Sequence, residues 1–218
     1  MTDTLIIQKA IEEIETKTFG VTEQLLDIHQ VVYENDQPRV ARVDTEKEDG
    51  SAIVYFPVKD EKFYLVIYLD TKPQVSVRSI GTENYNSVYL GVCSEMFSMQ
   101  ELTEMTKLKV TEGHCKGDKR GKNGSTYWKY SKVCFEPNPE PDEFEDKLKK
   151  LLDVLETDKE GIKQLVEKAD ACIQVAQVFH IGNTMIGGSF IDNESIKRMA
   201  NLNLSIDFDL SVGGNLYK

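Results

Sequence analysis

The chain is organised around one stretch, Leu108-Lys-Val-Thr-Glu-Gly-His-Cys-Lys-Gly-Asp-Lys-Arg-Gly-Lys-Asn-Gly-Ser-Thr-Tyr-Trp-Lys-Tyr-Ser-Lys-Val-Cys-Phe135. A short apolar run leads into a basic loop that is punctuated by glycines. Trp128, the only tryptophan, then stands at the head of a second run with the composition of a strand. Because glycine permits the backbone conformations that a tight loop requires, the stretch predicts a hairpin with a cationic loop.

Positive charge is concentrated in this hairpin. Residues 107–132 carry eight basic and two acidic side chains, a net charge of +6. The 218-residue chain has a net charge of −11, so the residues outside this stretch carry −17. Backbone amides and lysines of the Gly-rich loop 113–124 can bind a phosphate or a carboxylate, and aromatic rings beside it can stack on a base. The candidate ligand-binding residues are Lys116, Asp118, Lys119, Arg120 and Trp128. A structural alternative is a solvated loop followed by aromatic residues that enter the core.

The chain before the hairpin predicts one helix and a β-meander. One helical face carries Ile7, Ala10, Ile11 and Ile14. Residues 21–33 fit either a helix or a strand. Three runs rich in β-branched and aromatic residues follow at 52–58, 63–69 and 75–80, joined by short turns, which is typical of antiparallel strands. We therefore expect an N-terminal α plus β-meander module at residues 1–86.

The second section begins with a strand pattern at residues 88–93 and a helix start after it. Ser98 and Glu101 have the spacing of a capping box. Asp142 and Thr157 head two later helical patterns, the first of which carries a stripe of leucines. Residues 172–180 are apolar on both faces apart from Gln174 and Gln177, which is typical of a central strand.

The last strand pattern alternates strictly between apolar and polar residues. The side chains expected to face the core are Leu204, Ile206, Phe208, Leu210 and Val212. Asp207 and Asp209 share the opposite face, where paired carboxylates can do acid/base or metal chemistry or can simply face solvent. The succession β-α-β-β-α-β-α-β predicts an α+β fold for residues 87–218, with a mainly antiparallel sheet, helices on one face and a ferredoxin-like arrangement.

These features resemble a bacterial family catalogued only as domain of unknown function 4279. The resemblance rests on the strand at 88–93, the helix at Ser98, the Lys-Gly-Asp at 116–118, Trp128 and the closing strand. It covers about residues 86–214 and leaves the N-terminal module unassigned. It implies a fold and no established activity.

Composition narrows the class of protein. Hydrophobic residues make up 40% and charged residues 29% of the chain, as in globular proteins. No apolar run approaches the roughly 20 residues of a membrane helix, no signal peptide is visible, and the four cysteines are widely spaced. We therefore expect a cytoplasmic protein with free thiols. The adjacent His114 and Cys115 lack the spacing of a zinc site, and no nucleophile signature is present, so we expect no metal, no cofactor and no catalytic residue.

The sequence favours a non-enzymatic protein-interaction module, in one version an immunity-type protein that binds a basic partner. Strong negative charge can speed and steer such an association. The alternative is a binder or enzyme for a small phosphorylated or carboxylated ligand at the basic loop. Repulsion from the remaining −17 disfavours nucleic acid and an anionic membrane surface. The sequence leaves the oligomeric state open.

Overall fold

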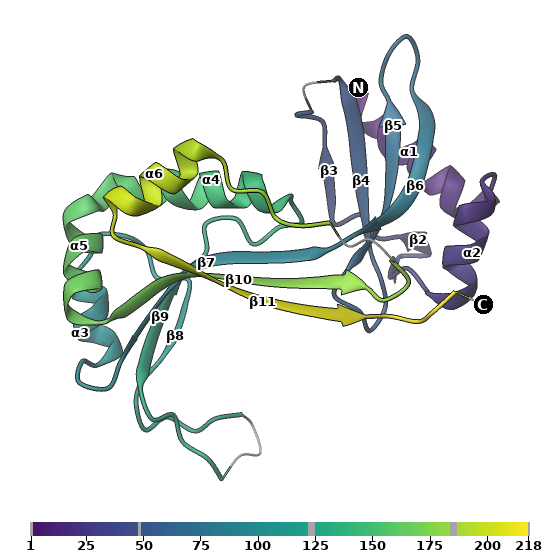
Figure 1. The fold of residues 1–218 in the computed structure, drawn as a ribbon. Coiled ribbons are helices and arrows are strands. Elements are labelled where there is room, and N and C mark those ends of the chain that lie inside the picture. Colours follow the sequence, from purple (N-terminus) through teal and green to yellow (C-terminus); the bar gives the residue numbers. More distant parts are fainter. Residues whose placement is uncertain (1, 48, 122–124, 184–186, 218) are drawn as a thin grey trace. The chain divides into compact units, whose positions relative to one another are not determined.

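A computed structural model describes residues 2–47, 49–121, 125–183 and 187–217, and Figure 1 shows their helices and strands. The chain divides into two compact units. The first consists of Met1–Tyr85, Gln177–Gly187 and Leu210–Lys218, and the second consists of Asn86–Ala176 and Gly188–Asp209. The first unit thus includes two late segments of the chain, and the expected division into two consecutive domains at residues 86–87 stays a prediction.

The first unit contains two helices and a four-stranded antiparallel sheet. Its elements are α1 (Thr2–Thr16), α2 (Gly20–Ile28), β1 (Tyr33–Glu34), β2 (Gln37–Pro38), β3 (Arg42–Asp44), β4 (Ser51–Pro57), β5 (Tyr64–Asp70) and β6 (Ser76–Glu83). The sheet order is β3-β4-β5-β6, so the predicted meander is confirmed. The buried face of α1 is centred on Ile6, Ala10 and Ile14, while Ile7 and Ile11 are only half-buried. The ambiguous residues 21–33 are helical up to Ile28.

The second unit contains the succession of elements that the sequence predicts. Its elements are β7 (Tyr85–Ser94), α3 (Met99–Glu104), β8 (Glu112–His114), β9 (Ser131–Phe135), α4 (Phe144–Leu155), the 3₁₀ turn η1 (Glu156–Asp158), α5 (Lys159–Lys168), β10 (Asp170–His180), α6 (Asn193–Asn201) and β11 (Ser205–Gly213). The first and last of these strands have their ends in the first unit. The chain is a mixed α+β protein with antiparallel sheets, as predicted.

The five strands have the order β11-β10-β7-β9-β8. The part β10-β7-β9-β8 is the order of a ferredoxin-like β-α-β-β-α-β unit, in which the last strand lies beside the first. β11 is added beside β10 and forms the outer strand (Figure 1). The predicted central strand, β10, therefore has neighbours on both sides.

The helices of the second unit pack on one face of this sheet. Val88, Leu90 and Val92 of β7 alternate along the strand and are buried in one core with apolar residues of α3, α4, α5 and α6. Ser98 and Glu101 form the predicted capping box at the start of α3. The intervening residues of the strands point to the opposite face, which we call the open face.

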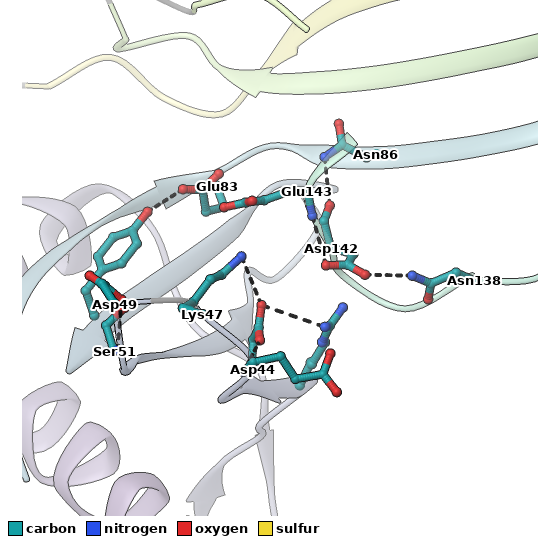
Figure 2. Close-up of polar contacts among 12 residues, drawn as sticks. Asp44, Lys47, Asp49, Ser51, Glu83, Asn86, Asn138, Asp142 and Glu143 are labelled. Carbon is teal, nitrogen blue, oxygen red and sulfur yellow. Dashed lines mark hydrogen bonds and ion pairs between the residues drawn. The ribbon is translucent and has the colours of Figure 1, made fainter. Parts of the chain in front are cut away.

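Two helix starts differ from the sequence prediction. The N-cap of α4 is Glu143, without a side-chain cap, and the carboxylate of the buried Asp142 instead accepts hydrogen bonds from Asn138 Nδ2 (2.7 Å) and Lys150 Nζ (2.8 Å). Figure 2 shows Asp142 between Asn138 and Asn86, whose Nδ2 donates to the Asp142 carbonyl (2.8 Å). The second difference is that α5 is capped by Asp158, one residue after the expected Thr157.

The last strand is buried over only part of its length. Leu204 is 8% exposed and Ile206 packs against the core, whereas Phe208 is 36%, Leu210 55% and Val212 55% exposed. Phe208 still faces the core, because its ring lies 5.6 Å from that of the buried Phe144 of α4. The prediction that all five face the core is therefore wrong for Leu210 and Val212. The alternation of side chains is present, but β11 is the outer strand, and its residues from Leu210 onward lie outside the second unit.

Candidate functional site

The basic stretch forms a two-stranded ribbon that extends from the sheet of the second unit (Figure 1). β8 and β9 pair at its base, and the pairing continues outward through Trp128 and Asp118, where the Trp128 amide donates to the Asp118 carbonyl (2.9 Å). Further out, the Arg120 amide donates to the Thr126 carbonyl (2.8 Å). Lys122, Asn123 and Gly124 lie outside the described residues. We call residues 112–135 the basic ribbon.

Trp128 is the centre of an aromatic stack on the basic ribbon. The His114 ring lies parallel to it with centroids 3.9 Å apart, and the Arg120 guanidinium lies over the indole at 4.7 Å from the centroid. Tyr130 contacts both rings at a tilt. Trp128 is half-buried within the ribbon and belongs to none of the three hydrophobic clusters of the described residues, so the structural alternative in which it enters the core is wrong. Its packing surface comes from the ribbon itself.

The predicted ligand-binding residues make different contacts within the ribbon. Lys116 Nζ donates to the Glu95 carbonyl (2.9 Å), and the Asp118 carboxylate closes a turn by accepting from the Cys115 amide (2.7 Å). Lys119 is exposed, while Arg120 packs on the indole. Three of these side chains thus have intramolecular contacts, and their assignment to a ligand site stays a prediction.

His114 carries an unusual buried atom. Its Nε2 is shielded from solvent and has no hydrogen-bond partner among the described residues. Burial lowers the pKa of His114, and the charge of Lys132 acts in the same direction. The imidazole is therefore neutral near pH 7. Within the described part of the chain, no three His, Cys, Asp or Glu side chains are grouped so that they could hold a metal ion.

A second candidate site lies on the open face, where three strands bring polar side chains together. Tyr89 Oη of β7 donates to Gln174 Oε1 of β10 (2.7 Å). Lys132 Nζ of β9 lies 3.3 Å from Tyr89 Oη and 3.5 Å from Gln174 Oε1, and it stacks over the tyrosine ring at 5.0 Å. These residues are far apart in the chain. Gln174, one of two glutamines in the mainly apolar strand β10, was a sequence signal for this site.

Asp207 and Asp209 of β11 border this polar group. With Tyr89, Gln174 and other residues of β10 and β11, they line a hollow of about 370 Å³. Both carboxylates are exposed, and neither has an ion-pair partner among the residues that the structure describes. The open face therefore offers two unneutralised negative charges beside an aromatic ring and an amide. The predicted placement of the two aspartates on one exposed face is confirmed.

The open face also carries three thiols, of Cys93, Cys134 and Cys172. Burial raises the pKa of each, that of Cys134 to about 11. Thiols with raised pKa values are protonated near pH 7 and are poor nucleophiles. All four cysteines of the chain are free. The chemistry of the open face is thus that of hydrogen bonding and charge.

One of three comparisons with known proteins found a match. Residues 83–213, more than half of the chain, match the family described as Domain of unknown function (DUF4279). The chain belongs to this family. Searches of the curated proteins and of the solved structures gave no match. The family description names no activity, so any function must be argued from the two surfaces described above.

Over residues 2–47, 49–121, 125–183 and 187–217, no helix is both long and apolar enough to cross a membrane.

Proposed function

We propose that the chain is a non-enzymatic interaction module whose open face binds an extended, basic segment of a partner protein. The observation that carries the proposal is the pair of unneutralised carboxylates, Asp207 and Asp209, beside the hollow of about 370 Å³ on the outer strand. Lysine or arginine side chains can neutralise both carboxylates. The ring of Tyr89 then offers packing to the aliphatic stems, and the amide of Gln174 offers a hydrogen bond to a cationic head group.

The position of β11 supports an extended partner. As the outer strand it has a hydrogen-bonded neighbour, β10, on one side of the described sheet. The backbone of an outer strand can add a further strand, so that main-chain hydrogen bonds supply affinity and alternate side chains supply specificity. A basic partner strand would place its cationic residues opposite Asp207 and Asp209 and an apolar residue opposite Phe208, which is 36% exposed.

Charge argues for a different protein as the partner in preference to a second β11. Antiparallel pairing of two β11 strands centred on Asp207, Phe208 or Asp209 would place aspartates directly opposite one another. Like charges in directly opposed positions destabilise a strand pair. A basic strand has the complementary pattern and would be steered by the −17 carried outside residues 107–132. An immunity-type protein that neutralises a basic toxin is one concrete form of this function.

The test uses a fluorescent peptide in which lysine and valine alternate, and anisotropy as the readout. The double variant Asp207→Asn/Asp209→Asn should bind about tenfold more weakly at low salt, because two exposed ion pairs together contribute about 1.4 kcal/mol. Binding to the parent chain should weaken as salt is raised to about 0.5 M. A peptide in which glutamate replaces lysine should not bind.

The matched control is Glu15→Gln/Glu23→Gln, which makes the same change of charge at exposed positions of α1 and α2. It should bind the basic peptide like the parent chain. Equal weakening by both double variants would show that only net charge matters and would refute a site on the open face. Binding unaffected by either double variant would refute it as well.

A second candidate is a small anionic ligand at the basic ribbon. The specific observation in its favour is the unpartnered Nε2 of His114 beside Trp128 and the Arg120 guanidinium. This function predicts that a phosphorylated or carboxylated metabolite raises the melting temperature, and that Lys116→Ala/Arg120→Ala abolishes the shift. A panel of nucleotides, sugar phosphates and carboxylates that leaves the melting temperature unchanged would count against it.

A further inference from the structure

Three segments far apart in the chain meet at a buried pair of histidines in the first unit. His29 ends α2, and His180 ends β10. The side chains are buried, with 6% and 1% of their surface exposed, and their Nε2 atoms lie 2.8 Å apart. The carboxyl-terminal segment, residues 213–217, packs against them: the Tyr217 ring lies 5.3 Å from that of His180, and Asn215 Nδ2 donates to the Ile28 carbonyl (2.8 Å).

The contacts of the pair assign its protons. His180 Nδ1 lies 3.2 Å from the Gly182 amide, which can only donate, so Nδ1 is an acceptor without a proton. The proton of neutral His180 is therefore on Nε2 and is donated to His29 Nε2. The Asn215 amide also points to His29 Nε2 (3.5 Å). His29 thus accepts at Nε2 and carries its own proton on Nδ1.

A further proton on either ring breaks this arrangement. On His180 it would sit at Nδ1 and face the amide proton of Gly182. On His29 it would sit at Nε2 and face both the His180 proton and the Asn215 amide. A donor that faces a donor loses its hydrogen bond and leaves buried polar groups unsatisfied. Each protonation therefore removes a contact that joins α2, β10 and the carboxyl-terminal segment.

The carboxyl-terminal segment packs closely over the pair. A Cβ on Gly214 would stand 2.8 Å from Phe63, 2.9 Å from His180 and 3.0 Å from His29. A Cβ on Gly182 would stand 2.6 Å from both His180 and Tyr217. Gly214 has a φ of +91°, a conformation that glycine adopts readily, so the segment turns directly over the imidazoles. A donor-donor contact at the pair therefore lies directly against this segment, and movement of the segment relieves it.

The charges around the pair do not overcome the effect of burial, which favours neutral rings. Burial lowers the pKa of both His29 and His180, while the nearby Glu61 acts in the opposite direction. Asp27, Lys59, Asp60 and Glu61 line the hollow on the His29 side, and the Tyr217 phenol, whose pKa is raised by burial, faces His180. These are the ionisable side chains of the described elements packed on the pair.

We propose that His29 and His180 form a proton-sensitive latch that holds residues 213–217 against the first unit and releases them when the pair takes up a proton. The latch is closed at neutral pH, where both rings are neutral. It opens as the pH falls below about 6.5, the ordinary pKa of a solvated histidine, because the released state binds more protons than the closed state. The proposal is independent of the partner proposed for the open face.

Hydrogen exchange of the full chain tests the latch. The probes are the Ile181 amide, which donates to the Gly213 carbonyl (2.8 Å), and the Asn215 amide, which points to His29 Nε2. Their protection, expressed relative to their intrinsic exchange rates, should fall by up to about tenfold for each pH unit below 6, as release coupled to one proton requires. Nitrogen-15 spectra of the three imidazoles should show His29 protonated on Nδ1 and His180 on Nε2 at pH 7.5. The opposite tautomers would overturn the proposal even if no variant could be prepared.

Variants separate the latch from general acid destabilisation. His180→Gln should remove the pH-dependent loss of protection at Ile181, and His29→Gln should do the same. His114→Gln, which changes the remaining histidine in the second unit, should retain it. If the pH dependence persists in both latch variants, or if the Ile181 and Asn215 amides keep full protection at pH 5, the latch does not exist.

Discussion

The cap of α5 provides the sharpest test of how the second unit is held together. The Asp158 carboxylate accepts hydrogen bonds from the Lys107 amide (2.6 Å), the Thr106 hydroxyl (2.8 Å) and the Gly161 amide (3.2 Å). It therefore caps α5 and ties that helix to the segment after α3. The perturbation is Asp158→Ala, with Asp158→Asn as a variant that keeps an acceptor and loses the charge.

The expected cost follows from these contacts. Loss of an N-cap costs about 1 kcal/mol, and the Lys107 amide and Thr106 hydroxyl each lose a bond worth about 0.5–1.5 kcal/mol. Asp158→Ala should thus lower the free energy of unfolding of the second unit by about 2–4 kcal/mol, and Asp158→Asn by about half as much. Glu160→Ala, at an exposed first-turn position, should change it by less than about 0.5 kcal/mol.

The difference in stability between the parent chain and Asp158→Asn should depend on pH in one defined direction. The hydrogen bond from the Lys107 amide, followed by that from Thr106, lowers the pKa of Asp158 below its ordinary value. A depressed pKa in the folded state stabilises the fold above the unfolded pKa of about 3.9, and this stabilisation is lost as the pH falls through the folded pKa. The gap between the parent chain and Asp158→Asn should therefore narrow below pH 4.

Unfolding in urea should be monitored through hydrogen exchange of the amides within α5, because two compact units need not unfold in one transition. The reasoning is refuted if Asp158→Ala and Glu160→Ala have the same stability. It is also refuted if the difference between the parent chain and Asp158→Asn is unchanged between pH 7 and pH 3.

Three further predictions concern the ribbon, the thiols and the helix surface. Arg120→Ala should expose the only indole, so acrylamide should quench Trp128 fluorescence more strongly than in the parent chain, and unchanged quenching would contradict the stack. At pH 8, iodoacetamide should label Cys134 last of the four thiols, because it is 8% exposed and its pKa is raised to about 11, as peptide mass spectrometry can check. Arg198→Ala should cost about 1 kcal/mol at low salt and less at high salt, through loss of its ion pair with Glu156, and a salt-independent cost in urea unfolding would point to packing instead.

Local patterns predicted the local structure well. Ser98 and Glu101 form their capping box because both partners lie within one helical turn. The errors are also local in origin: Asp158 replaces Thr157 as the cap because its second oxygen bonds to Lys107 and Thr106, which lie about 50 residues earlier. The sequence of a single helical turn contains no information on partners that lie so far away along the chain.

The candidate site could be predicted only in part. The exposed face of Asp207 and Asp209 follows from the period of two along a strand. Their neighbours Tyr89 and Gln174 were missed. The predicted ferredoxin-like arrangement places β10 beside β7, but no local pattern indicates which residues of the two strands meet. The sequence favoured the basic ribbon because its composition is conspicuous, whereas the open face consists of ordinary residues in an uncommon combination.

The sequence by itself determined the element order, the capping box, the meander and the apolar face of each strand, because short-range periodicity encodes these features. Tertiary structure decided the position of β11 beside β10, the half-exposed last strand and the two long-range clusters. Tyr89 and Gln174 meet through strand pairing across the sheet, and His29 meets His180 although 151 positions separate them. Contacts at such separation depend on the packing of whole elements, because no local pattern specifies which element will be the neighbour.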